Sequence, residues 1–255
     1  MASSSDDLFG FSLFGVFLGL AAFGKGFMTL RRKRLIENTP TSKVRSLAMG
    51  FSEVSGEALP RGGNLLKSPF SGKDCLYYRY EVEEYRRSGK RSRWVTIKKG
   101  SKWVLFHVKD DTGEVVVDPA GAEVDIPIDF TTEPGGEKSV SPVLAEFMNQ
   151  EGLKLTGFLG FSKKLRFSEY FIAPGDKLFV LGTAGDNPFV GEGTAVEGFK
   201  DVMIQKGDGP LFYISDKSEK SCLKQHRVSM ALQIYGGGAA FVASLAYILL
   251  KFNLF

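Results

Sequence analysis

The chain has 255 residues, of which 43% are hydrophobic and 24% are charged, and its net charge is +4 at neutral pH. The four consecutive cations at residues 31–34 account for that excess by themselves, so the rest of the chain is electrically neutral. A nucleic-acid-binding domain normally has a strongly basic surface, and the composition therefore argues against a nucleic acid as partner.

The first element is an apolar stretch at residues 8–30, which is long enough to cross a bilayer because the hydrocarbon core requires about 20 apolar residues. Asp6 and Asp7 precede it and the four cations follow, so the positive-inside rule places its C-terminal end in the cytoplasm. A cleaved signal peptide would have the opposite charge order. Lys25 lies inside the stretch, near enough to its end for the ammonium group to reach the lipid headgroups.

The region that follows is expected to be mainly β. Residues 75–85 alternate between an apolar face that begins with Leu76 and a more polar face that includes Arg79, as in a half-buried strand. Many short strands separated by turn residues are typical of a small barrel or a sandwich. The other strand-like runs are residues 44–54, 94–98, 103–108, 114–117, 165–172, 177–182 and 211–214.

Two local motifs in this region predict a defined geometry. Ser141 and Pro142 are suited to the N-cap and first position of a helix that is expected to stop at Gly152. Residues 173–176, Ala-Pro-Gly-Asp, predict a type II turn, because Pro fixes φ and Gly permits a positive φ. The apolar stripe of the helix consists of Val143, Leu144, Phe147 and Met148.

A second apolar stretch at residues 228–250 is also long enough to cross a bilayer. Four cations precede it and only Lys251 follows, which again places the central region inside. A further helix is expected to start near Ser215 or Asp216, with Glu219 completing a capping box, and to continue into this stretch. The preceding cations are Lys217, Lys220, Lys224 and Arg227.

Both apolar stretches contain small residues four positions apart, which lets membrane helices approach closely. Three interpretations are open: the two helices pair within one chain, they pair between two copies, or the small residues reflect the ordinary composition of membrane helices. The residues are Gly15 and Gly19 in the first stretch, and Gly236, Ala240 and Ser244 in the second.

A basic cluster surrounds the turn at residues 88–89 and is the most distinctive surface feature of the central region. It consists of Arg86, Arg87, Lys90, Arg91 and Arg93. One interpretation is contact with anionic lipid headgroups, and the other is a solvated hairpin tip. Tyr77 and Tyr85 are further candidate contact residues if their strand face is exposed.

No catalytic arrangement is recognisable. Motifs of hydrolases, metalloproteases, phosphate loops and dinucleotide sites are absent from the sequence, and His107 has no identifiable partner. The glycine-rich residues 185–198 are expected to form a mobile loop rather than a phosphate cradle. We therefore expect no catalytic residue, no cofactor-binding residue and no metal ligand. The carboxylates expected only in Asx turns, at strand ends and in solvent are Glu83, Asp110, Asp118, Glu169 and Asp176.

The two cysteines are far apart in the sequence and are expected to be reduced thiols in a cytoplasmic domain. Cys75 begins an apolar strand and is expected to be buried. Cys222 lies just before the second apolar stretch, where a thiol could be acylated, although only its position suggests this.

Four segments resemble the GIDE domain, also called the "beside a membrane" domain. They are residues 37–58 (ENTPTSKVRSLAMGFSEVSGEA), 68–85 (SPFSGKDCLYYRYEVEEY), 166–184 (RFSEYFIAPGDKLFVLGTA) and the region of 211–221 (LFYISDKSEKS). The family includes a mitochondrial E3 ubiquitin ligase, and the resemblance implies a soluble domain between two membrane helices. In that relative the domain faces the intermembrane space, whereas the charges of this chain favour the cytoplasm.

The resemblance does not extend to a RING finger, which in such ligases follows the second membrane helix and needs eight Cys or His ligands for two zinc ions. This sequence contains two cysteines and two histidines, His107 and His226. Ubiquitin ligase activity of the chain itself is therefore not expected.

The expected organisation is a tail at residues 1–7, membrane helices at 8–30 and 228–250, a GIDE-like β-rich domain at 31–227 with one or two helices, and a tail at 251–255. We expect a multi-pass membrane protein with both termini outside, whose cytoplasmic domain binds a protein, or less favourably a lipid, without a catalytic site. The expected partners are the bilayer, an unidentified protein and a second copy through the membrane helices. The alternatives are a RING-less component of a protein-modification system, and an accessory barrel for membrane-scaffold oligomers, similar in plan to NfeD-type proteins.

Overall fold

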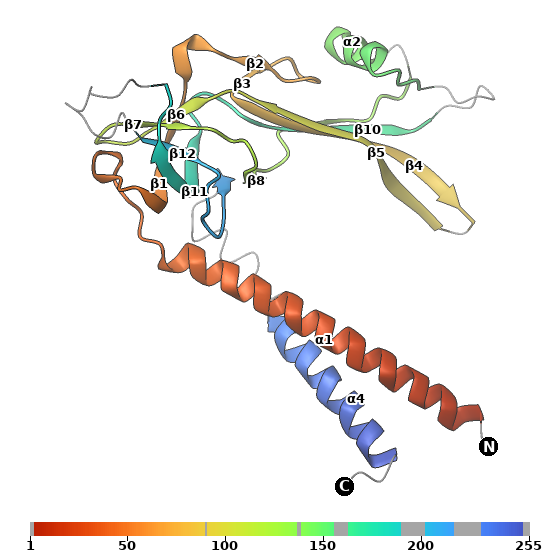
Figure 1. Cartoon of the computed structure of the whole chain (residues 1–255). Helices are drawn as coiled ribbons and strands as arrows, with labels where there is room; N and C mark the ends of the chain where they lie inside the picture. The colour runs from red at the N-terminus through yellow and green to blue at the C-terminus, as the bar shows by residue number, and fades with distance from the viewer. Residues whose placement is uncertain are drawn as a thin grey trace. The chain divides into compact units, whose positions relative to one another are not determined.

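The computed structural model describes residues 3–89, 91–136, 139–155, 163–189, 202–216 and 231–251. The chain divides into two compact units, one formed by Met1–Thr39 with Ser218–Phe255 and the other by Pro40–Lys217 (Figure 1). Each unit has its own architecture and is described separately.

The first unit consists of two apolar helices. Helix α1 spans Ser3–Asn38, and α4 spans Gly237–Lys251 after a π-helical turn, η4, at Leu232–Gly236. The segments apolar enough to cross a membrane are Gly10–Ile36 and Leu232–Lys251. With 36 residues, α1 is about 54 Å long and exceeds the roughly 30 Å of a hydrocarbon core. It extends beyond the predicted residues 8–30 at both ends and includes the four cations at its C-terminal end.

The two helices pack antiparallel through glycines (Figure 1). A Cβ atom added to Gly19 would lie 2.8 Å from the backbone nitrogen of Phe241, and one added to Gly15 would lie 3.3 Å from Cβ of Ser244. Gly237 is buried against Ala22 and Phe23, whereas Gly236 and Ala240 are exposed. The small residues therefore pair the two helices within one chain, and Gly237 takes the place predicted for Gly236.

The second unit contains a closed five-stranded barrel. Its first strand pairs with both β6 and β11, β6 pairs with β7, and β12 closes the ring by pairing with β7 in parallel and with β11 antiparallel. Numbered along the chain, the barrel strands follow the order 1-2-3-5-4, which is the Greek-key order of an OB-fold. The strands are β1 (Gly50–Pro60), β6 (Phe106–Lys109), β7 (Glu114–Val117), β11 (Lys177–Asp186) and β12 (Val202–Gln205).

Short strands extend this sheet beyond the barrel. Strand β13 (Tyr213–Ser215) pairs with β11, and β8 (Glu123–Asp125) pairs with β13 in parallel. Alternate side chains point into the barrel, where Val54, Phe106 and Ile204 are completely buried. The resulting apolar core holds the barrel together, since buried aliphatic and aromatic side chains each contribute about 1.5–3 kcal/mol.

The two insertions between barrel strands build a second, four-stranded sheet beside the barrel (Figure 1). Its strand order is β5-β4-β10-β9, and β10 continues through a tight turn directly into β11 of the barrel. The strands are β4 (Tyr77–Ser88), β5 (Arg91–Trp103), β9 (Phe130–Thr132) and β10 (Leu165–Ile172). A separate pair is formed by β2 (Leu66–Lys67) and β3 (Asp74–Cys75).

Helix α2 (Pro142–Gln150) packs on the second sheet. The Phe70 ring lies at the centre of this second core, with edge-to-face contacts to Phe147 at 4.9 Å and Phe167 at 5.4 Å between ring centroids. Ser141 caps the helix, since its hydroxyl accepts a hydrogen bond from the Leu144 N–H at 3.3 Å. Gly152 ends the helix with φ of 65°, as predicted.

The predicted fold class is confirmed: the chain is mainly β, contains a small barrel and has apolar helices at both ends. The turn at residues 173–176 is also confirmed, because Gly175 has φ of 93° and the Asp176 N–H donates to the Ala173 carbonyl. The strand predicted at residues 44–54 is wrong in its first part, where Val44–Ser46 is a 3₁₀ turn and β1 begins only at Gly50.

Two further predictions differ from the structure at element ends. A helix does not start at Ser215, because this residue ends β13 and its hydroxyl donates to the Asp125 carbonyl at 2.7 Å. Residues 217–230 of that predicted helix, including Glu219, lie outside the described residues. Gly185 belongs to β11 rather than to a loop, and the glycine-rich residues from 190 onward are likewise outside them.

Candidate docking sites on the β-rich unit

A bend in β1 creates the first candidate site. The strand pairs with β11 from Gly50 to Glu57 and with β6 from Glu57 to Pro60, so it changes partner at a single position. A Cβ atom at Gly56 would lie 2.7 Å from the carbonyl carbon of Lys109, which only glycine avoids. This close approach lets the strand curve around the barrel.

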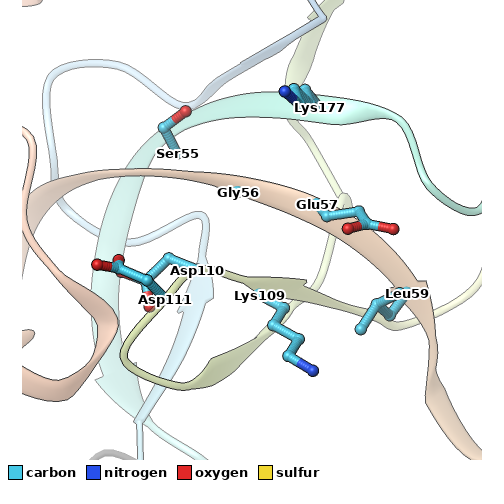
Figure 2. Close-up of a pocket in the computed structure, with 8 residues that line it drawn as sticks. All are labelled: Ser55, Gly56, Glu57, Leu59, Lys109, Asp110, Asp111 and Lys177. Atoms are coloured by element: carbon cyan, nitrogen blue, oxygen red, sulfur yellow. The ribbon is translucent and has the colours of Figure 1, made fainter.

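A groove of about 420 Å³ lies over this bend and is lined mainly by charged side chains of both signs (Figure 2). Leu59 is the one apolar side chain among its lining residues. Small-molecule sites of this volume are usually enclosed and apolar, so an open, charged groove is better suited to the surface of another macromolecule. The lining residues are Ser55, Gly56, Glu57, Leu59, Lys109, Asp110, Asp111 and Lys177.

Asp110 shapes the groove rather than offering a free charge. One carboxylate oxygen accepts hydrogen bonds from the N–H groups of Thr112 and Gly113 at 2.7 and 3.0 Å, and the other accepts from the Val44 N–H at 3.0 Å. Burial opposes ionisation, but these bonds and the one from the Thr112 hydroxyl outweigh it and lower the pKa of Asp110. The β6–β7 turn is therefore held rigidly, as the predicted Asx turn requires.

Glu57 is the central charge of the groove. It lies opposite Lys109 on one neighbouring strand and opposite Lys177 on the other, and all three residues are exposed. Asp111 at the rim forms an ion pair with Lys43, which raises the pKa of that lysine mainly through the hydrogen bond between them. A carboxylate between two lysines on rigid strands can bind an extended polypeptide segment that has both positive and negative side chains.

The predicted basic cluster lies at the tip of the long β4–β5 hairpin (Figure 1). Arg86, Arg87, Arg91 and Arg93 are all exposed, as is the turn glycine Gly89 with φ of 59°. Lys90 lies outside the described residues. The structure thus brings the predicted arginines together on one projecting element.

The two candidate tyrosines have different environments. Tyr77 is only 7% exposed and packs in the barrel core, so the condition for its role as a contact residue, an exposed strand face, is not met. Tyr85 is 44% exposed and contacts the Trp94 ring edge-to-face at 5.2 Å. Lys164 and Arg166 lie over the Trp94 ring, with the guanidinium carbon of Arg166 3.9 Å from its centroid.

Glu169 shows the largest difference between predicted and observed burial, because a surface carboxylate is expected at this position. It is completely buried in the middle of β10. One of its oxygens accepts from the Phe70 N–H at 2.8 Å and the Ser71 N–H at 3.3 Å, and the other accepts from the Ser71 hydroxyl. The side chain thus fastens the loop that carries Phe70 onto the second sheet.

The other predicted residues have mainly structural surroundings. Asp118 accepts from the Ala120 N–H at 3.0 Å and Asp176 from the Ala173 N–H at 2.7 Å, as expected of turn carboxylates. Glu83 lies 3.7 Å from Arg166 in an ion pair. Burial lowers the pKa of His107, which lies on β6 opposite Leu59 and Val116.

Cys75 is buried as predicted, and burial raises the pKa of its thiol to about 12. Cys222 and His226 lie outside the described residues. Among the residues that the structure does describe, no group of three or more His, Cys, Asp or Glu side chains is suited to hold a metal ion.

The groove was not predicted from the sequence. Its lining residues come from β1, β6, the following turn and β11, which are up to 122 positions apart and meet only in the closed barrel. Gly56 within a strand-like run is a local signal that could have pointed to a bend or a close backbone approach.

Comparison with known proteins identifies one family. The family model for GIDE, described as E3 ubiquitin ligase, matches residues 77–249, which is more than half of the chain. The match covers the second sheet, most of the barrel and the second apolar helix. No curated protein and no solved structure matches the chain.

Proposed function

The chain belongs to the GIDE family, and we propose that it is a two-pass membrane protein that presents its β-rich unit for protein interaction at the membrane surface. In this proposal the chain has no catalytic site of its own. The helices α1 and α4 serve as the anchor, and the groove at the bend of β1 serves as the docking site.

The observation that carries the proposal is the distribution of side chains on the helix pair. Glycines lie between the helices, while large apolar side chains point outward: Phe14, Phe17 and Met28 are 62–74% exposed on α1, and Leu232 on η4 and Leu250 on α4 are more than 70% exposed. A water-soluble helix pair buries its large apolar residues and exposes polar ones. The reverse arrangement is that expected of helices that pack in lipid.

The antiparallel pairing also supports a two-pass topology. If both helices cross the bilayer, the chain termini emerge on one side and the two connections to the β-rich unit on the other. The cations at residues 31–34 favour the cytoplasm for the β-rich unit. We therefore propose a cytoplasmic domain with both termini outside.

The groove favours a protein over a nucleic acid as the ligand. OB-type barrels commonly bind oligonucleotides or oligosaccharides on one face. Here the groove has the exposed carboxylate of Glu57 at its centre, and this carboxylate would repel a phosphate backbone. The alternating charges suit a polypeptide segment instead.

Site-specific photo-crosslinking in native membranes tests this proposal. A crosslinking residue at Lys109 or Lys177 should trap one defined protein, whereas the same residue at exposed Glu146 on α2 should not. The substitution Glu57→Lys should abolish the adduct because it reverses the central charge of the groove. Absence of any adduct from the groove, together with turnover of a substrate by the purified chain, would refute the proposal.

The family description supports a second candidate function, in which the chain is a component of a ubiquitin-ligase system whose catalysis resides on another polypeptide. Incubation of the purified chain with ubiquitin and its activating and conjugating enzymes should then yield no ubiquitin chains. Addition of the protein trapped at the groove should restore chain formation if this candidate is correct.

The closed barrel supports a third candidate, an accessory role in membrane-scaffold oligomers similar in plan to NfeD-type proteins. This role predicts that the full chain migrates with a large scaffold oligomer on native gels. Migration as a single chain or dimer would speak against it.

A further inference from the structure

The tip of the β4–β5 hairpin extends as a two-stranded arm beyond the second sheet. Strand β10 pairs with β4 only as far as Glu84, and the last backbone contact is the Tyr85 N–H to the Lys164 carbonyl at 2.9 Å. From Arg86 to Arg93, each strand has only the other as its partner among the described strands. We call residues 86–93 the arginine arm.

The arm concentrates positive charge in a way that does not favour folding. Arg86 lies directly opposite Arg93, and Arg91 is on the same face because it is paired with Ser88. Like charges directly opposite each other destabilise a strand pair. Glu84 offsets Arg86 at 2.6 Å, but no described acidic residue forms an ion pair with Arg87, Arg91 or Arg93.

The base of the arm is rigid and already neutralised. Glu84 also lies 3.6 Å from Lys163, and Glu133 pairs with Arg166 at 2.7 Å and Lys164 at 3.2 Å. These cations cover the Tyr85–Trp94 pair at the start of the arm. The arginines of the arm therefore lie beyond this neutralised base, on a projection from the sheet.

We propose that the arginine arm binds the anionic phospholipid surface of the membrane in which the chain is anchored. Lipid phosphates and carboxylates would supply the counter-charge that no described acidic residue gives to Arg87, Arg91 or Arg93. Arginine suits this role because its planar guanidinium forms paired hydrogen bonds with phosphate oxygens. Four arginines on an exposed tip match a surface of many anions better than a single small anion.

This inference rests on the proposed membrane attachment. A unit tethered at both ends remains close to the bilayer, so a modest electrostatic attraction is sufficient to hold the arm on it. Contact at the arm would restrict how the β-rich unit is oriented and hence how the groove is presented to its partner.

Fluorescence quenching of a label on the arm tests the inference with the full chain in lipid nanodiscs. Cys222→Ser first removes the competing thiol, while buried Cys75 can stay because it does not react. The label is then placed at Ser92→Cys on the arm. A separate variant with the label at exposed Gln150→Cys serves as reference. Discs of phosphatidylcholine alone are compared with discs containing phosphatidylserine, and neutral acrylamide is the quencher. We expect the quenching of Ser92→Cys to fall by about threefold in the anionic discs and that of Gln150→Cys to stay unchanged.

Charge reversal supplies the matched control. Because each surface arginine contributes about fivefold to membrane affinity, Arg91→Glu with Arg93→Glu should restore the quenching seen in neutral discs. Lys99→Glu with Lys102→Glu changes the net charge equally on the same strand, outside the arm, and should leave the protection in place.

The outcomes separate the inference from the proposed function. A chain that remains in neutral discs after alkaline extraction but shows equal quenching at Ser92→Cys in both lipids would overturn the inference and leave the anchor intact. Equal protection by inorganic phosphate in neutral discs would also overturn it, in favour of a small-anion site. A chain released from neutral discs by alkali would refute the anchor and the inference together.

Discussion

Glu169 shows at the scale of one residue how the second sheet is held to its covering loop. Its buried carboxylate accepts hydrogen bonds from Phe70 and Ser71, which positions the Phe70 ring between β10 and α2. A buried carboxylate is costly unless its oxygens are satisfied, and three donors satisfy this one. Its position in a strand interior could not be distinguished from a solvent-facing carboxylate by sequence alternation alone.

We predict that Glu169→Ala lowers the free energy of unfolding by about 3 kcal/mol, because buried N–H groups lose their acceptor. Glu169→Gln should cost less, since it retains one acceptor oxygen. Urea unfolding followed by tryptophan fluorescence measures this, because Trp94 and Trp103 both lie on β5. The same change at exposed Glu146 should have little effect, and equal effects at both positions would contradict the proposed role.

Cys75 provides a prediction about pH. Its thiol pKa of about 12 is above that of a free thiol, so folding favours the protonated form and this contribution to stability is lost as the pH rises from 9 towards 12. At pH 8 the reactive thiolate is about a thousandfold scarcer than in an unfolded chain. Alkylation followed by mass spectrometry should leave Cys75 unmodified until denaturant is added. Rapid modification in the folded chain would contradict its burial.

Among the helices, strands and turns, those whose capping or turn residues are all present in the local sequence could be predicted from it. Helix α2 has its cap at Ser141 and its stop at Gly152, and the turn before β11 has Pro174 and Gly175 in the required order. Strands β8, β9 and β12 are only three or four residues long, too short for a readable alternation. Their place depends on partners far away in the chain.

The two candidate sites also differ in whether they are built from residues close in sequence or from strands far apart in the chain. The arginine arm is local, since its residues are close in sequence around a two-residue turn, and it could be predicted. The groove depends on β1, β6 and β11 meeting at one bend, which is a property of the closed barrel. Periodicity within one strand carries no information about such a meeting.

Gly56 tests the bend directly. We predict that Gly56→Ala lowers stability by more than about 2 kcal/mol, because the added methyl group would overlap the Lys109 carbonyl and force the two strands apart. Gly135→Ala is the control, since no atom lies within 4 Å of a Cβ atom there. Thermal unfolding of both variants compares them, and similar melting temperatures would contradict the close approach.

At the scale of the whole molecule, the helix pair decides whether the β-rich unit is a membrane-held domain. We predict that Gly19→Ile disrupts the pair, because its side chain would meet the Phe241 and Gly237 backbone, whereas Gly24→Ile has open space and should be tolerated. Disulfide formation between Gly15→Cys and Ser244→Cys reports the pairing, since the two Cβ atoms lie about 3.3 Å apart. Efficient cross-linking in the Gly19→Ile background would contradict this packing.

Labelling with a membrane-impermeant thiol reagent tests whether the two helices form a two-pass anchor that presents the β-rich unit on one side of the membrane. Single cysteines are placed in tags at the two termini and at Ser92 of the β-rich unit, in a chain without Cys222. We predict that both termini react in intact cells and that Ser92→Cys reacts only after the membrane is permeabilised. Termini on opposite sides, or reaction of Ser92→Cys in intact cells, would contradict it.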